Sequence, residues 1–303
     1  MAPAFSASGR GPAAGHRRAM SDLLVFGRTG QVAIALQRLA PVRAMGRDAA
    51  DLAQPDACAA AIHAHRPRVV INAAAYTAVD RAEEEEAPAT TINGSAPTAM
   101  AVTCAALNIP FVHISTDYVF AGTGGRAWAP DDATAPANAY GRSKWAGEQG
   151  IRASGATHAI LRTSWVFSAH GNNFVKTMLR LSDGRDAVNV VDDQIGGPTP
   201  ARAIAAACLA IADQLQTDPS KTGTYHFSGA PDVSWCTFAR AIFEAAGRPT
   251  RVQGIPSSAY PTPAARPLNS RLDCRTTDAV FHLPRPDWRA GLHECLADLG
   301  VST

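Results

Sequence analysis

The sequence predicts an α/β protein: a Rossmann-like doubly wound parallel sheet with a smaller C-terminal substrate-binding domain. Three observations lead to this prediction. An apolar strand at residues 22–26 runs directly into a glycine turn and a helix, short apolar strands then alternate with helices to about residue 165, and beyond residue 169 the alternation weakens. Regular alternation of this kind is typical of parallel sheets covered by helices on both faces.

Length and composition describe an ordinary globular protein. The chain has 303 residues, of which 46% are hydrophobic and 18% charged, so it can bury a substantial core. A formal charge of +2 gives no electrostatic reason to expect nucleic acid or an anionic membrane as a partner. The six cysteines are scattered without a Cys-x-x-Cys pair, which disfavours a disulfide framework or a zinc site and favours buried thiols in a reducing compartment.

The first twenty residues are rich in Ala, Gly, Pro and Arg and contain no apolar run long enough for a signal peptide or a membrane span. We expect residues 1–20 to be a disordered N-terminal extension. Two alternatives are a start at Met20 and an arginine-rich organelle transit peptide.

A phosphate-binding corner is predicted at Gly27, Gly30, Gln31 and Val32, between the first strand and a helix that runs to about residue 39. Glycines allow the backbone to approach a pyrophosphate, which then sits on the helix N-terminus. The spacing is Gly-x-x-Gly-x-x-Ala, shifted from Gly-x-Gly-x-x-Gly, and the alternative is a tight βα connection. The position at the start of the alternation favours the dinucleotide.

Arg47 follows the second strand, residues 42–46, where an NAD-specific site usually places an acid for the ribose 2′-hydroxyl. Arginine suits a 2′-phosphate instead, so we predict NADPH over NADH, with Arg28 as a second phosphate partner. The alternative is that both arginines are solvated surface cations.

Tyr140 and Lys144 stand one turn apart at the start of a predicted helix. Positions i and i+4 share a helical face, and an ammonium beside a phenol favours the phenolate, so we expect a Tyr140 that exchanges protons near neutral pH. A carbonyl reduction by hydride needs such an acid. The alternative is that this segment is only the exposed start of an amphipathic helix. Thr116, at the end of the strand at residues 111–115, can bond to Tyr140 or to a substrate carbonyl.

Later segments are expected to form the substrate domain. Trp165, at the end of a strand at residues 158–161, is either a flat face for a sugar ring or a core tryptophan. We expect a turn at residues 192–199, and a proline-rich passage at residues 256–267 that lies over the substrate and forms no long helix or central strand. The acidic run Glu83 to Glu86 is interpreted as a solvated face.

These motifs together resemble the dTDP-4-dehydrorhamnose reductases of the extended short-chain dehydrogenase/reductase superfamily, from about residue 23 to residue 288. The stretches that carry the resemblance are residues 26–32, 72–80, 115–120, 140–144, 162–166, 171–174, 193–199 and 259–270. They match in order and spacing.

The resemblance implies roles for individual residues. Tyr140 is expected to be the proton donor, with Lys144 lowering its pKa and holding the nicotinamide ribose. Thr116 orients the substrate, and Asp117 and Trp165 line the deoxysugar pocket. The expected cofactor contacts are Gly27, Gly30, Gln31, Val32, Arg47, Asp51, Leu52, Ala73, Ala74, Ala75, Tyr140 and Lys144.

The implied activity is NADPH-dependent reduction of dTDP-4-dehydro-L-rhamnose to dTDP-L-rhamnose, the final step of dTDP-rhamnose biosynthesis, in the cytoplasm. The partners are a small nucleotide sugar and NADPH, with NADH possible; no nucleic acid or membrane is expected. The implied domains are residues 21–165 for NADP and mainly 166–303 for the substrate, with segments near 186–216 returning to the first.

The resemblance leaves other matters open. Alternatives to the implied activity are a non-catalytic NADP-binding regulatory subunit and another nucleotide-sugar reductase or epimerase. Ala35 stands where some members carry a glutamate that is linked to magnesium-bridged dimers. The need for magnesium and the formation of a homodimer are therefore left open, and no metal ligands are identified.

Overall fold

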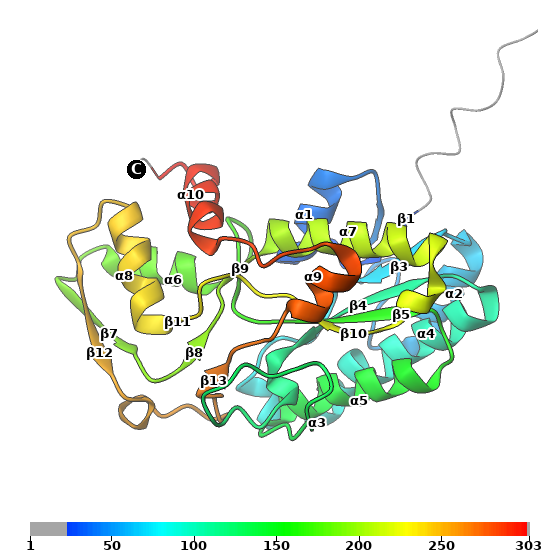
Figure 1. The fold of residues 1–303 in the computed structure, drawn as a ribbon, viewed down its shortest axis with the longest axis horizontal. Coiled ribbons are helices and arrows are strands. Elements are labelled where there is room, and N and C mark those ends of the chain that lie inside the picture. The colour runs from blue at the N-terminus through cyan, green and yellow to red at the C-terminus, as the bar shows by residue number, and fades with distance from the viewer. Residues whose placement is uncertain (1–22, 302–303) are drawn as a thin grey trace, which may run out of the picture.

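The protein, described here by a computed structural model, is built around one large parallel sheet beside a smaller part rich in helices (Figure 1). The structure describes residues 23–301. The predicted extension at residues 1–20 and the alternative start at Met20 lie outside the described residues.

The large sheet has six strands in the order β10-β5-β4-β3-β1-β2, and every neighbouring pair is parallel. The strand order reverses between β1 and β3, which is the point where doubly wound sheets bind ligands at the carboxyl ends of their strands. This confirms the predicted fold class. The strands are β1 (Leu23–Phe26), β2 (Arg43–Met45), β3 (Val69–Asn72), β4 (Phe111–Thr116), β5 (His158–Thr163) and β10 (Gly223–His226).

Alternate residues of the strands feed two separate cores. Val25 and Ile71 pack under one helical layer, whereas Leu24, Phe26 and Val70 pack under the other, as the period of two in a strand requires. The upper layer in Figure 1 contains α1 (Gln31–Leu39) and α7 (Ala201–Thr217). The lower layer contains α2 (Pro55–His65), α4 (Ala96–Leu107) and α5 (Ala139–Ala153).

Short helical turns connect these elements. They are η1 (Arg81–Glu83), α3 (Glu86–Thr90), η2 (Thr91–Ser95), η3 (Asp117–Val119) and η4 (Pro219–Lys221).

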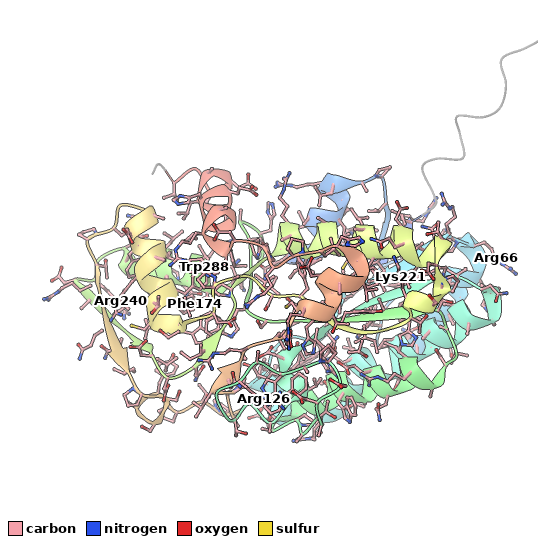
Figure 2. All side chains as sticks on the ribbon, viewed as in Figure 1. Arg66, Arg126, Phe174, Lys221, Arg240 and Trp288 are labelled. Carbon is pink, nitrogen blue, oxygen red and sulfur yellow. The ribbon has the colours of Figure 1, made fainter. Side chains whose placement is uncertain are left out.

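The smaller part has its own apolar core. The ring of Phe238 lies 5.7 Å from that of Phe174 and 5.3 Å from that of Trp288, measured between centroids. Phe174 and Trp288 are labelled in Figure 2. Its helices are α6 (Phe174–Ser182), α8 (Trp235–Ala245) and α10 (Trp288–Asp298). Its strands are β7 (Ala187–Val191) with β12 (Arg251–Ile255), and β8 (Ile195–Gly196) between β11 (Val233–Ser234) and β13 (Asn269–Ser270).

The chain crosses between the two parts more than once. After β7 it returns to the large sheet through α7 and β10, and α9 (Arg275–Phe281) packs there too. The passage at residues 192–199, expected as a turn, contains β8 and the first residue of β9 (Thr199–Pro200), which pairs with β6 (Val166–Phe167). These strands are two residues long, too short for a sequence period to reveal.

The proline-rich segment, residues 256–267, contains only the short turn η5 (Ser257–Ala259), as expected. This segment packs against the part of the chain that forms the large sheet. Arg266 pairs with Asp80 at 2.6 Å, and the carbonyl of Ala265 accepts a hydrogen bond from Asn138 at 2.8 Å. These two contacts hold the segment against Asp80 and against Asn138, the N-cap of α5.

Candidate active site

A cleft of about 990 Å³ opens at the carboxyl ends of β1, β3, β4 and β5. Every residue that the sequence singled out for cofactor, substrate or catalysis lines this cleft. These residues are Gly27, Arg28, Gly30, Gln31, Val32, Arg47, Asp51, Leu52, Ala73, Ala74, Ala75, Thr116, Asp117, Tyr140, Lys144 and Trp165.

The glycine corner has the shape that a pyrophosphate requires. Gly27 has φ +112°, and a Cβ there would meet the carbonyl carbon and oxygen of Ala73 at 3.2 Å. Gly30 caps α1 and has no side chain to occupy the first free N–H groups of the helix. An anion can therefore reach the positive end of α1 across a backbone that only glycine permits.

The rim of the corner carries both signs of charge. Arg28 forms an ion pair with Asp48, with Nη2 2.9 Å from Oδ1, and both side chains are at least half exposed. The guanidinium of Arg28 holds the pKa of Asp48 below its usual value. Arg47 also lines the cleft. Asp48 was missed in the sequence, although it follows Arg47 directly.

Helix α5 is fixed tightly at its first turn. The side chain of Asn138 accepts a hydrogen bond from the Gly141 N–H at 2.8 Å, and Glu83 accepts one from the Ala139 N–H at 2.8 Å. A Cβ on Gly141 would lie 2.3 Å from the carbonyl oxygen of Tyr118, so only glycine allows this approach. The acidic run is thus more than the solvated face expected: Glu83 caps the helix that carries Tyr140.

The phenol of Tyr140 lies between Thr116 and Tyr118. The two tyrosine rings meet edge to face at 5.4 Å. Burial raises the pKa of Tyr140 to about 12; a hydrogen bond with Thr116 lowers it, and the Asp117 charge raises it further. The phenol therefore stays protonated across the physiological range.

Lys144 lines the same cleft as Tyr140, and its side-chain nitrogen is held by groups of β4. Its side chain is 2% exposed, and its Nζ lies 2.7 Å from the carbonyl oxygen of Ile114 and 3.1 Å from Nε2 of His113. Burial lowers the pKa of Lys144 to about 8, against the opposing charge of Glu148. Burial dominates the pKa of both groups, and Lys144 is not among the groups that shift the pKa of Tyr140 in this structure; the expected effect of Lys144 on Tyr140 stays a prediction.

The remaining cleft wall is formed by the ends of β4 and β5. Burial raises the pKa of Asp117 to about 6, and the side chains of Ser270 and Thr116 offset part of that rise. Thr163 stands beside Thr116 in the strand register, and its hydroxyl has no hydrogen-bond partner among residues 23–301. It was missed, although it lies in a quoted motif.

Trp165 belongs to the cleft wall and is not a core tryptophan. Its φ is +50°, and its ring stacks on Trp235 with centroids 3.6 Å apart and planes 10° apart. The strained backbone and the stacked ring of Trp235 fix the position of the Trp165 indole. An aromatic ring fixed in this way suits contact with a planar base or a sugar ring.

Within residues 23–301 no group of three or more His, Cys, Asp or Glu side chains is placed to hold a metal ion. No helix in the same range combines the length and apolarity that crossing a bilayer requires. All six cysteines are buried and unpaired, as the sequence predicts.

Comparison with known proteins decides the family. Residues 20–301 match the family described as "RmlD substrate binding domain". The dTDP-4-dehydrorhamnose reductase of Sinorhizobium fredii is 42% identical over 276 residues, which cover 88% of this chain and 93% of the relative. The chain belongs to the dTDP-4-dehydrorhamnose reductase family.

Further members agree in sequence and in structure. The dTDP-4-dehydrorhamnose reductase of Escherichia coli K12 is 40% identical over 297 residues, which cover 93% of this chain and 99% of the relative. The crystal structure of the Bacillus anthracis reductase in complex with NADP superposes with a TM-score of 0.85 at 32% identity, covering 91% of this chain and 98% of that one. The predicted resemblance is therefore confirmed.

Proposed function

We propose that this member of the dTDP-4-dehydrorhamnose reductase family reduces the C4 carbonyl of dTDP-4-dehydro-L-rhamnose with NADPH and forms dTDP-L-rhamnose, the last step of dTDP-rhamnose biosynthesis. The observation that carries the proposal is the shared cleft: Tyr140, Lys144 and Thr116 line the same space as the glycine corner of α1. A binding module has no need of a phenol, a lysine and a hydroxyl gathered at the strand ends beside a dinucleotide corner.

The high pKa of Tyr140 suits a reduction. When bound, the reduced dinucleotide supplies the hydride. The alkoxide that forms on the sugar then needs a proton, and the phenol of Tyr140 carries one at neutral pH because its pKa is raised to about 12. Thr116, hydrogen-bonded to the phenol, orients it toward the sugar oxygen.

Substrate contacts follow from the cleft wall. We assign the fixed indole face of Trp165 and the buried carboxyl of Asp117 to the deoxysugar, and the corner of Gly27, Gly30, Gln31 and Val32 to the pyrophosphate of the cofactor. Asp51, Leu52 and residues 73–75 would contact the adenosine and ribose. These assignments agree with where the side chains lie in the cleft.

NADPH is the proposed cofactor because Arg28 and Arg47 both lie on the cleft rim near the end of β2. Arginine forks bind a 2′-phosphate with two parallel hydrogen bonds. Asp48 opposes this preference, because its carboxylate is paired with Arg28. We place the reaction in the cytoplasm, where nucleotide sugars for cell-surface polysaccharide are made.

The test is to mix the protein with NADPH and dTDP-4-dehydro-L-rhamnose, follow the loss of NADPH absorbance, and identify the product by mass spectrometry and NMR. Stoichiometric NADPH oxidation with formation of dTDP-L-rhamnose supports the proposal. A protein that binds NADPH but reduces nothing would be a regulatory subunit. Oxidation only with other 4-keto nucleotide sugars would show a different reductase.

A further inference from the structure

A buried hydrogen-bond chain runs from the lysine of the active site to the cofactor loop. Nζ of Lys144 lies 3.1 Å from Nε2 of His113, and Nδ1 of His113 lies 3.1 Å from Nδ2 of Asn72. The side-chain oxygen of Asn72 accepts a hydrogen bond from the Ala74 N–H at 3.1 Å. Asn72 and His113 are partners in the register of β3 and β4, so the sheet itself holds them together.

The backbone N–H of Ala74 fixes which group donates and which accepts in each hydrogen bond of this series. An amide N–H can only donate, so the Ala74 N–H requires the oxygen of Asn72, and the Asn72 amide nitrogen must then face His113. That nitrogen donates to Nδ1 of His113, which must therefore be unprotonated. A neutral imidazole carries its proton on the other nitrogen, so Nε2–H points at Lys144.

A donor facing Lys144 favours one charge state of the lysine. An ammonium has three N–H donors and no acceptor, so it would place a donor against a donor at 3.1 Å. An uncharged amine has one lone pair for the His113 N–H and two N–H groups. One of these donates to the carbonyl of Ile114 at 2.7 Å, and the other is free for the cleft.

His113, which contacts Lys144, and Asn72, which contacts His113, are both shielded from water. His113 is 0% exposed and Asn72 is 1% exposed, so a mismatched donor cannot be rescued by solvent. We propose that His113, oriented by Asn72, is a positioning residue that favours the uncharged amine of Lys144 and thereby sets the pH at which this lysine takes up a proton. The inference rests on the proposed function for its bearing on catalysis, because Lys144 matters there as the neighbour of the proton donor.

Other charged groups near Lys144 act differently. Glu148, one turn further along α5, favours the charged lysine, but its carboxylate is occupied by Arg162 and Arg152. On β5, His158 faces His113, and its Nδ1–H donates a hydrogen bond to the carbonyl of Ala156, 2.8 Å away. Tyr140 and Asp117 face the cleft and hold their protons more tightly than free side chains do. Burial and the His113 donor thus act in the same direction on Lys144.

The functional consequence concerns proton supply. A lysine that titrates near the working pH can take a proton from solvent and return one to the phenolate left after Tyr140 has protonated the sugar. A lysine that is always charged would stabilise the phenolate and slow its reprotonation. The His113 and Asn72 pair therefore tunes how readily Tyr140 is reset between turnovers.

The test uses the small lysine content of the chain, which has three lysines, Lys144, Lys176 and Lys221. Lysine labelled with ¹³C at Cε gives one signal for each, and Lys176→Arg and Lys221→Arg assign them. In wild type we expect the Lys144 signal to titrate well below the other two. Asn72→Asp would accept from Nδ1–H and turn Nε2 into an acceptor, and His113→Gln would offer the lysine an amide oxygen; each should raise the Lys144 midpoint by about one pH unit or more.

His158→Gln is the matched control, since it also removes a buried imidazole next to His113 but makes no contact with Lys144; its midpoint should equal that of wild type. The ¹⁵N shifts of His113 give a test without substitution, because Nδ1 and Nε2 differ strongly when one is protonated. A proton on Nδ1 in wild type, an ordinary Lys144 midpoint, or equal shifts in all three variants would overturn the inference. None of these readouts needs turnover, so failure of the proposed activity is seen separately.

Discussion

Glu148 and Arg162 are both fully buried and are joined by two hydrogen bonds, Nε to Oε1 at 2.9 Å and Nη2 to Oε2 at 2.6 Å. Oε1 of Glu148 also accepts a hydrogen bond from Ser115 at 2.6 Å. Burial would raise the pKa of Glu148, but Arg162 outweighs it and holds that pKa below its usual value. The pair therefore ties α5, which carries Tyr140, to β4 and β5, which carry Thr116 and Thr163.

Removing one partner of this pair should be costly. We expect Glu148→Ala to lower the free energy of unfolding by about 3–5 kcal/mol, because the Arg162 guanidinium would be left buried without its counter-charge. Arg152→Ala is the control: Arg152 also binds Glu148, at 2.8 Å, but is 31% exposed, so its loss should cost about 1 kcal/mol or less. Urea unfolding followed by circular dichroism measures both, and similar losses would contradict the assigned role of burial.

The large sheet could be predicted from the sequence because its strands are continuous apolar runs. The predicted strand at residues 22–26 begins one residue before β1, and the predicted strand at residues 111–115 ends one residue short of β4. In the smaller part, β8 and β13 have two residues each and depend on partners distant in the chain, so no local pattern identifies them.

The residues expected at the site line one cleft, but the protonation of their side chains depends on burial that the sequence does not show. Tyr140 and Lys144 both line the cleft. Their charges depend on burial, and Lys144 also contacts His113, which lies inside an apolar strand. Pairing of His113 with Asn72 becomes visible only through the register of β3 and β4. Asp48 was missed because the interpretation of that turn concentrated on Arg47, which precedes it. Thr163 was missed because its position beside Thr116 depends on the register of β4 and β5.

Tyr140→Phe should abolish most turnover and leave cofactor binding intact. Losing a positioned proton donor costs about 10²–10⁴-fold in kcat, whereas the phenyl ring can keep its edge-to-face contact with Tyr118. Stopped-flow NADPH oxidation measures the first effect and NADPH fluorescence titration the second. Tyr118→Phe, the neighbouring phenol, serves as the control and should retain turnover. A Tyr140→Phe enzyme with full kcat would remove the proposed proton donor.

Asp117→Asn should stabilise the fold at neutral pH at the expense of substrate binding. Burial raises the pKa of Asp117 from 3.8 to about 6, so the folded protein holds this proton more tightly than the unfolded chain does. Below pH ~4 the group is protonated in both states and costs nothing. Between pH ~4 and ~6 the unfolded state loses the proton first, and stability falls as pH rises; above ~6 the full cost of up to ~3 kcal/mol remains.

Chemical unfolding at several pH values measures this dependence. The gain of Asp117→Asn over wild type should be absent at pH 3.5, grow through pH 5 and stay constant above pH 6.5. A gain that is the same at every pH would mean that the substitution acts through packing and not through the buried charge. The Michaelis constant for the nucleotide sugar should rise in the same variant.

Neighbouring residues on the cleft rim should change cofactor preference in opposite directions. Arg47→Ala should raise the Michaelis constant for NADPH about tenfold and leave that for NADH nearly unchanged, because a hydrogen bond to a charged phosphate is lost. Asp48→Asn should lower the constant for NADPH, since it frees Arg28 from its ion pair and removes a repelling carboxylate. Arg43→Ala, an exposed arginine at the start of β2, is the control and should change neither constant. The NADPH effects should weaken in high salt, as exposed charges are screened. If wild type prefers NADH, or if Arg47→Ala weakens both cofactors equally, the assignment of Arg47 to the 2′-phosphate is wrong and Asp48 becomes the partner of a ribose 2′-hydroxyl.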